Sequence, residues 1–133
     1  MNPMFSISGV EAVQLLHGLV RVDLHQIKRA KLAKGKYPII RAIQNKTLRY
    51  RRADPQEHWK TWRELMSELK TNGKAYADCE DLASAVVAEL NYNGIKARNY
   101  VYKSGRRLYH VVVKTERWGF IDPSRAAGME TNG

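Results

Sequence analysis

The sequence predicts an α+β fold in which helices pack on a small antiparallel β-sheet. Apolar residues recur at steps of three or four in the first third of the chain and again after Cys79, which is the spacing of a helix. The last third instead holds short apolar runs separated by turn residues, which is typical of strands joined by hairpins. A chain of 133 residues, 44% of them hydrophobic, is long enough for one domain with its own core.

A long amphipathic helix is expected over residues 9–33. It begins at a capping-box pattern and should end at Gly35, because glycine readily adopts the left-handed conformation that closes a helix. His17 and His25 fall on this helix without matching ligand residues, so we interpret both as structural or surface residues.

The next part of the chain should hold two shorter elements and a second helix. We expect a short helix or turn over 38–43, an extended segment over 47–51, and a helix over 55–70 that begins at an Asp-Pro pair. Trp59 and Trp62 would lie on the apolar face of that helix, and we expect both rings in the core.

The central feature is a helix over 79–92 whose first residue is the only cysteine of the chain. Asp78 is a good N-cap, and Asp81 lies three residues later, much as in a capping box. Asn93-Gly94 should end the helix. Free N–H groups and the positive end of the helix dipole would favour a thiolate at Cys79.

Three strands should follow, over 95–102, 108–114 and 118–121. A tight turn between the last two would form a hairpin and bring Asp122 back beside His110, although the sequence does not fix the register. The small polar residues from 126 onward are expected to form a frayed tail.

The positive charge is concentrated in one segment. The net charge is +10, and residues 21–52 carry eleven Lys or Arg and one acid, whereas the rest of the chain is balanced. Such a segment can bind nucleic acid or another polyanion, or it can be a solvated surface. The candidate contacts for a polyanion are Lys28, Arg29, Lys31 and Lys34.

A single cysteine cannot form an internal disulfide, which fits a reducing compartment or a particle assembled in one. The chain has no long apolar run and no signal-peptide pattern at its start, so we expect a cytoplasmic protein without a membrane partner. The sequence indicates no metal site and no cofactor, and it leaves the oligomeric state open.

A lone cysteine followed by a histidine and an acid is a candidate catalytic group. Cys79 would be the nucleophile, His110 the general base, and Asp122 the residue that orients the imidazole. The alternative is that Cys79 is a small buried apolar residue at a helix start.

Four motifs carry a resemblance to a known superfamily, and they occur at 78–83, 94–97, 109–113 and 121–124. In this order they resemble the transglutaminase-like core of the papain-like cysteine peptidase superfamily. The likeness is closest to small members carried by tailed bacteriophages, and it covers about residues 37–129. Further matching features are Tyr37-Pro38, the basic run 49–52, Trp59 and Gly128-Met129.

The resemblance implies a domain organisation as well as a site. Residues 1–36 would form a basic N-terminal helix, 37–129 the catalytic core and 130–133 a tail. It also implies the Cys-His-Asp roles given above, and a host cytoplasm or virion location for a phage-encoded protein. The backbone N–H of Cys79 is a natural oxyanion donor, and Trp59 and Tyr76 are guesses for a second.

Three functions remain open on the sequence. The first is hydrolysis of a peptide, isopeptide or related amide bond through a thioester. The second is acyl transfer to an amine by the same thioester; crosslinking relatives commonly have an aromatic residue after the cysteine, whereas Glu80 stands here, which favours hydrolysis. The third is a non-catalytic protein that binds a polyanion or a partner through its basic segment.

Overall fold

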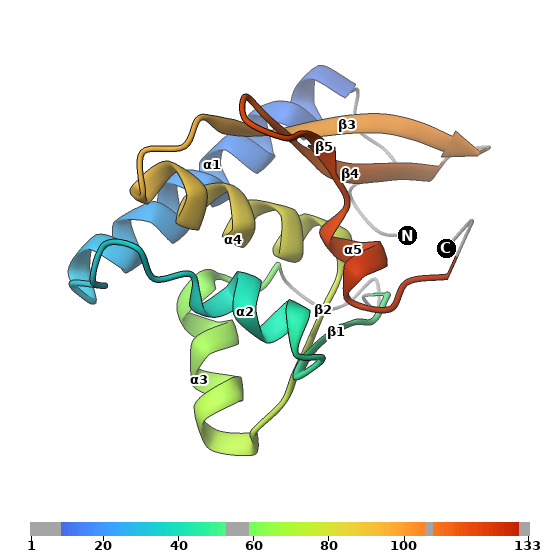
Figure 1. Cartoon of the computed structure of the whole chain (residues 1–133). Coiled ribbons are helices and arrows are strands. Elements are labelled where there is room, and N and C mark those ends of the chain that lie inside the picture. The colour runs from blue at the N-terminus through green and yellow to red at the C-terminus, as the bar shows by residue number, and fades with distance from the viewer. Residues whose placement is uncertain (1–8, 53–58, 106–107, 131–133) are drawn as a thin grey trace.

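Helix α4 (Cys79–Tyr92) lies at the centre of the fold, and the other elements are arranged around it (Figure 1). The structure is a computed structural model that describes residues 9–52, 59–105 and 108–130. Every residue of α4 from Cys79 to Leu90 is buried. A helix that is apolar and buried on every face needs other elements packed around it, and these elements are therefore arranged about α4.

Four further helices pack around α4 in the part of the chain that the structure describes. Helix α1 lies along α4, α2 covers a second side, and the short α5 crosses near the N-terminal end of α4, while α3 packs against α1, α2 and β2 (Figure 1). Their bounds are α1 Gly9–Arg29, α2 Pro38–Gln44, α3 Trp62–Asn72 and α5 Pro123–Ala126.

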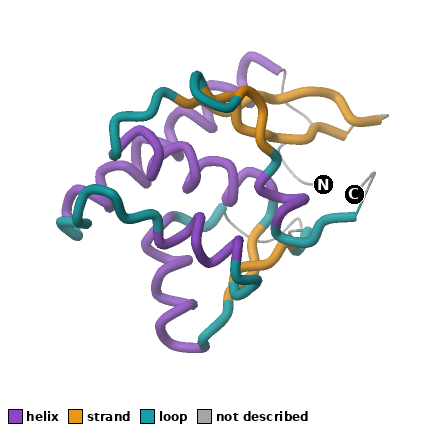
Figure 2. The backbone as a smooth tube through the Cα atoms, in the orientation of Figure 1, coloured by secondary structure: helices purple, strands orange, loops and turns teal. Residues whose placement is uncertain are grey.

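The strands form two separate sheets, which Figure 2 shows in orange on different sides of the helices. One is an antiparallel sheet in the order β3-β4-β5, and the other is a parallel pair of β1 with β2. Their bounds are β1 Leu48–Tyr50, β2 Ala75–Ala77, β3 Ala97–Gly105, β4 Leu108–Thr115 and β5 Gly119–Ile121. The predicted α+β class is confirmed at this level of detail.

One face of the three-stranded sheet packs against α4. Asn99 on β3 donates a side-chain hydrogen bond to Ser84 Oγ on α4 at 3.2 Å, and Val111 on β4 is fully buried. Because side chains alternate along a strand, His110 and its cross-strand neighbour Tyr102 belong to the opposite face.

Helix α1 ends earlier than the sequence predicts. Its last residue is Arg29, and Lys31 adopts a left-handed φ of 54°. The N–H of Leu32 then reaches the carbonyl of Ile27 at 3.4 Å, and that of Lys31 reaches the carbonyl of Lys28 at 3.0 Å. These two bonds form a Schellman motif closed by a lysine, so the expected end at Gly35 is wrong.

The second predicted helix also differs at its start. Helix α3 begins at Trp62, and Thr61 forms a capping box with Glu64. Trp59 therefore precedes the helix, although it is still half-buried, while Trp62 lies in the core as predicted. The expected Asp-Pro start of this helix lies outside the described residues.

The C-terminal region is more ordered than the sequence suggests. Ala127 is buried, and its carbonyl accepts a hydrogen bond from the N–H of Tyr50 on β1 at 2.9 Å. The prediction of a frayed tail from residue 126 is therefore wrong for this part; residues 131–133 lie outside the described residues. No helix in the described ranges is long and apolar enough to cross a membrane.

A buried carboxylate on α4 supplies the cap of α2. The residue before α2, Tyr37, makes no side-chain cap. Glu89 instead accepts hydrogen bonds from the backbone N–H groups of Ile39 at 2.8 Å and Ile40 at 3.1 Å, and from the indole N–H of Trp62 at 2.9 Å. Glu89 thus provides partners for helix N–H groups that local residues leave open.

Helix α3 receives similar support from α1. The N–H of Trp62 donates to Asp23 at 2.8 Å, and the N–H of Arg63 donates to Gln26 at 2.9 Å. Asp23 is fully buried, and burial raises its pKa to about 7 despite the hydrogen bond from Trp62. Tertiary contacts therefore supply the cap of α2 and add to the local Thr61 cap of α3.

Replacing Glu89 tests this arrangement. Glu89→Ala removes three hydrogen bonds and leaves buried donors unpaired, so we expect a loss of about 3–5 kcal/mol in the free energy of unfolding. Glu89→Gln keeps one acceptor oxygen and should lose less. Urea unfolding measures both, with the exposed Glu116→Gln as the control; equal midpoints for Glu89→Ala and the wild type would contradict the capping role.

Candidate active site

Cys79 occupies the first position of α4, as predicted, and it is 7% exposed. Asp78 is the N-cap, and its Oδ1 accepts a hydrogen bond from the N–H of Cys79 at 2.7 Å. The N–H of Asp78 donates to Asp81 Oδ2 at 3.2 Å, so the predicted capping box is confirmed. The start of α4 is therefore held by two carboxylates on either side of the thiol.

His110 and Asp122 form a direct pair. His110 Nε2 lies 2.9 Å from Asp122 Oδ2, and the imidazole is 6% exposed. The predicted hairpin produces this contact, since β5 pairs with β4 up to Ile121 opposite Val113, and Asp122 follows at once. The ring of Tyr102 stands edge-on to the imidazole, with centroids 5.5 Å apart.

Asp122 has the environment of an ionised, orienting carboxylate. Burial by itself would raise its pKa, but the hydrogen bond from His110 and that from the N–H of Arg125 outweigh burial and hold the pKa below its usual value. The Arg125 guanidinium also lies 3.4 Å from Oδ2. With Nε2 bound to Asp122, Nδ1 is the ring nitrogen left for proton transfer.

The Cys79 sulfur lies at the edge of the sheet, against β4. Helix α4 packs on one sheet face and His110 belongs to the other, and no described contact joins the Cys79 sulfur to the imidazole. Strand β5 pairs no further along β4 than Val113, and the backbone N–H of Val111 is directed at the Cys79 sulfur. The sulfur therefore lies against β4 at the residue next to His110.

The surroundings of Cys79 favour a neutral thiol. Burial raises its pKa well above the usual value, and the charges of Glu80 and Asp78 raise it further, while the N–H of Val111 only partly offsets them. The expected thiolate at the helix start is not supported by this arrangement. The physical reason is that carboxylates already occupy the positive end of α4, where a thiolate would otherwise be stabilised.

Glu80 is a neighbour that the sequence analysis did not assign to the site. Its Oε2 lies 3.4 Å from the Cys79 sulfur, at hydrogen-bonding distance for a thiol. Burial and the nearby Asp78 raise the pKa of Glu80 to about 7. The sequence signal for this contact was the position of Glu80 directly after Cys79, because the first turn of a helix brings the polar side chains of neighbouring residues together.

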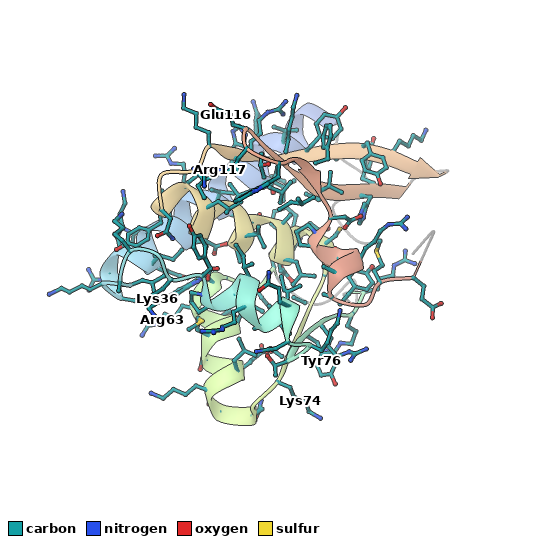
Figure 3. The ribbon with its side chains drawn as sticks, viewed as in Figure 1. Lys36, Arg63, Lys74, Tyr76, Glu116 and Arg117 are labelled. Carbon is teal, nitrogen blue, oxygen red and sulfur yellow. The ribbon has the colours of Figure 1, made fainter. Side chains whose placement is uncertain are left out.

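The proposed oxyanion donors are not brought together. The N–H of Cys79 is engaged by Asp78. Tyr76 lies between Ala75 and Ala77, which are buried, so its ring points away from the core and the Arg51 guanidinium stands 5.1 Å from its centroid (Figure 3). Trp59 packs against the core, and no described contact joins it to Cys79.

The candidate polyanion contacts lie at the other end of α4. Lys28, Arg29 and Lys31 are exposed where α1 ends. Lys34 is engaged, because its ammonium donates to the carbonyl of Tyr92 at 2.6 Å and stands 3.6 Å from the centre of that ring. Tyr92 is the last residue of α4, so these cations form a surface distinct from the Cys79 site.

Three neighbouring residues at the start of α4 could together ligate a cation, but we assign no metal site to them. The ligand atoms of Asp78, Cys79 and Glu80 lie within 4.8 Å of one another, and all three residues are buried. The N–H of Cys79 and its thiol already bond to the two carboxylates. These bonds explain the cluster without a metal ion.

Comparison with known proteins gives no family for the chain: no family model matches it, and neither does any curated protein or solved structure. The resemblance to the transglutaminase-like core therefore stays a prediction.

The role of Glu80 can be tested on the thiol itself. Glu80→Gln removes a charge that raises the pKa of Cys79, so the thiolate fraction at pH 7 should rise and alkylation by iodoacetamide should become at least several-fold faster. Rates are measured by mass spectrometry across pH 6–10, with Glu116→Gln as the control for loss of an exposed charge. An unchanged pH profile in Glu80→Gln would contradict the electrostatic coupling.

Asp81 gives a prediction for stability. Burial raises its pKa from 3.8 to about 8, with a further contribution from Glu80. A raised carboxylate pKa stabilises the folded state fully below the unfolded pKa, and this stability is lost as pH rises toward the folded pKa. We expect the free energy of unfolding to fall by on the order of 2 kcal/mol between pH 5 and pH 8.

The matched variant is Asp81→Asn, which cannot ionise and keeps an acceptor oxygen for one of the two N–H groups, that of Lys60 or that of Asp78. Its unfolding free energy should depend less on pH over the same range. Urea titrations at four pH values measure both chains, and parallel curves would rule out Asp81 as a source of the dependence.

Proposed function

We propose that the protein is a thiol-dependent amide-bond hydrolase that uses Cys79, His110 and Asp122. The observation that carries the proposal is the 2.9 Å pair of His110 with Asp122, together with a cysteine at the start of a buried helix whose sulfur lies against Val111, the residue after His110. A helix with an N-terminal cysteine, a strand with a histidine and an acid after the next strand is also the order of the papain-like core. That finer fold assignment belongs to the proposal.

In the proposed reaction, the sulfur of Cys79 attacks the carbonyl carbon of an amide. The thiol proton passes to His110 Nδ1, and the imidazolium then gives it to the leaving amine as the C–N bond breaks. Water then attacks the thioester carbonyl while His110 takes its proton, the C–S bond breaks to release the carboxylic acid, and His110 returns the proton to the Cys79 sulfur. Asp122 keeps the ring oriented and stabilises its cation.

The neutral thiol has a consequence for this mechanism. Because burial and two carboxylates raise the pKa of Cys79, the resting site does not hold a thiolate–imidazolium pair. The proton must leave the thiol during the attack, which makes general-base assistance essential. Glu80, at 3.4 Å, offers a second acceptor for that proton.

Acyl transfer to an amine is the alternative outcome of the same thioester. Hydrolysis and transfer differ only in whether water or an amine reaches the intermediate. Product analysis with an added primary amine separates the two, because only acyl transfer incorporates the amine into the product.

A generic acyl donor tests the catalytic proposal without a known substrate. With p-nitrophenyl acetate, Cys79 should displace nitrophenolate and form an acetyl thioester that mass spectrometry locates. Cys79→Ala should abolish the adduct, and His110→Ala should slow acylation by about 100-fold or more. His25→Ala, at an exposed histidine of α1, is the matched control. An equal effect of the two histidine variants, or an adduct elsewhere, would refute the proposal.

A second candidate function is polyanion binding by the basic segment. The only acid of residues 21–52, Asp23, is buried, so it does not reduce the surface charge of the exposed Lys28, Arg29 and Lys31. This observation favours an anionic partner such as nucleic acid, independent of Cys79.

Salt dependence tests this candidate. Changing Lys28, Arg29 and Lys31 to Gln should weaken binding to duplex DNA and reduce the log–log salt slope by up to about 3. The control is a triple change of the exposed Arg63, Lys70 and Lys74 on and after α3. Equal losses in both triples would indicate unspecific attraction by net charge.

A further inference from the structure

A groove of about 790 Å³ lies between α2, α4 and the turn that joins β4 to β5. Figure 3 shows Lys36 and Arg117 on opposite sides of α4, where the two rims of this groove lie. Its volume is within the range of about 300–1,000 Å³ that is usual for ligand sites. Neither Cys79 nor His110 lines it, and Asp122 is the one candidate catalytic residue among its lining residues.

Apolar side chains form a continuous part of the groove lining. Val86 and Leu90 of α4 line it together with Ile40 and Ile43 of α2, and Ile121 of β5 completes this surface. An apolar surface of this kind favours aliphatic or aromatic groups over charged ones.

The rims are cationic. Lys36 and Arg41 line the α2 side and Arg117 lines the hairpin side, and all three are exposed. The only acid among the lining residues is Asp122, which is already bound by His110 and Arg125. The positive charge of the rims therefore has no acidic counterpart within the groove.

The groove also connects to the candidate active site. Asp122 lines the groove and binds His110 at 2.9 Å. Trp118, which is 55% exposed, stands on the hairpin rim and offers an aromatic surface to a ligand. A chain bound along the groove would thus lie next to the carboxylate that positions the imidazole.

We propose that this groove binds a peptide segment in which acidic and apolar side chains alternate. The carboxylates pair with Lys36, Arg41 and Arg117, and the apolar side chains fill the surface over α4. The binding is independent of catalysis, whereas identifying the bound peptide as the substrate rests on the proposed hydrolase function. Acidic, apolar sequences near the amide bond are then the substrate class.

Two other anionic ligands fit less well. A nucleic-acid backbone would leave the apolar surface formed by α2 and α4 unfilled. A single aliphatic carboxylate would engage only one of the cationic rims, whereas the groove carries cations on both. A peptide satisfies both rims and the apolar surface at once.

Fluorescence anisotropy with labelled hexapeptides tests the inference on the full chain. The probe Glu-Leu-Glu-Phe-Glu-Leu should bind at least tenfold more tightly than its Gln-Leu-Gln-Phe-Gln-Leu counterpart. Arg117→Gln and Arg41→Gln should each weaken binding of the acidic probe about tenfold, and Trp118→Ala should weaken it as well. Lys74→Gln removes the same charge far from the groove, as Figure 3 shows, and should leave binding unchanged.

Two results would overturn the inference: equal binding of the two probes, or an equal loss in Lys74→Gln and Arg117→Gln. Displacement of the acidic peptide by oligo(dT) at a comparable concentration would instead assign the groove to nucleic acid. Cys79→Ala separates this inference from the proposed reaction, because it should bind the probe normally while losing acylation. Binding without any acylation of the wild type would refute the hydrolase alone.

Discussion

The fold depends on carboxylates buried around α4 that accept hydrogen bonds from the backbone of other segments. Glu89 binds the first N–H groups of α2, Asp81 binds the N–H of Lys60 just before α3, and Asp23 binds the N–H of Trp62. A carboxylate in an apolar interior is costly unless such donors surround it. Each acid therefore fixes where a neighbouring segment must lie, and the helices cannot shift along α4 without leaving both partners unsatisfied.

The same use of acids shapes the candidate site. Asp78 and Asp81 order the first turn of α4, which holds Cys79 in place. Burial of the same helix start raises the pKa of the Cys79 thiol, and the charges of Glu80 and Asp78 raise it further. Asp78, which stabilises the helix start, therefore also disfavours a preformed thiolate at Cys79. Catalysis by Cys79 would have to recover, through His110, the activation that the helix start does not provide.

The sequence was a good guide where local patterns decide the structure. The capping residues and apolar spacing predicted α4, and the turn before Trp118 predicted the hairpin that pairs Asp122 with His110. It failed where distant contacts decide. Lys31 adopts a left-handed conformation that propensity assigns to glycine, and the cap of α2 comes from Glu89, 50 residues away from Ile39. The parallel β1–β2 pair has no local signature, and neither does the burial that contributes most to the raised pKa of Cys79.

The shortness of β5 is what makes the candidate site possible. Its pairing with β4 covers only Val113 to Thr115, so the edge of β4 beside Val111 is left without a strand partner. The Cys79 sulfur lies at that edge, and Asp122 enters the same region because the chain turns into α5 instead of extending the sheet. Two more paired residues on β5 would place a backbone carbonyl where the sulfur now meets the N–H of Val111. A histidine on the outer face of the sheet and a cysteine beneath its inner face can cooperate only at such an interrupted edge.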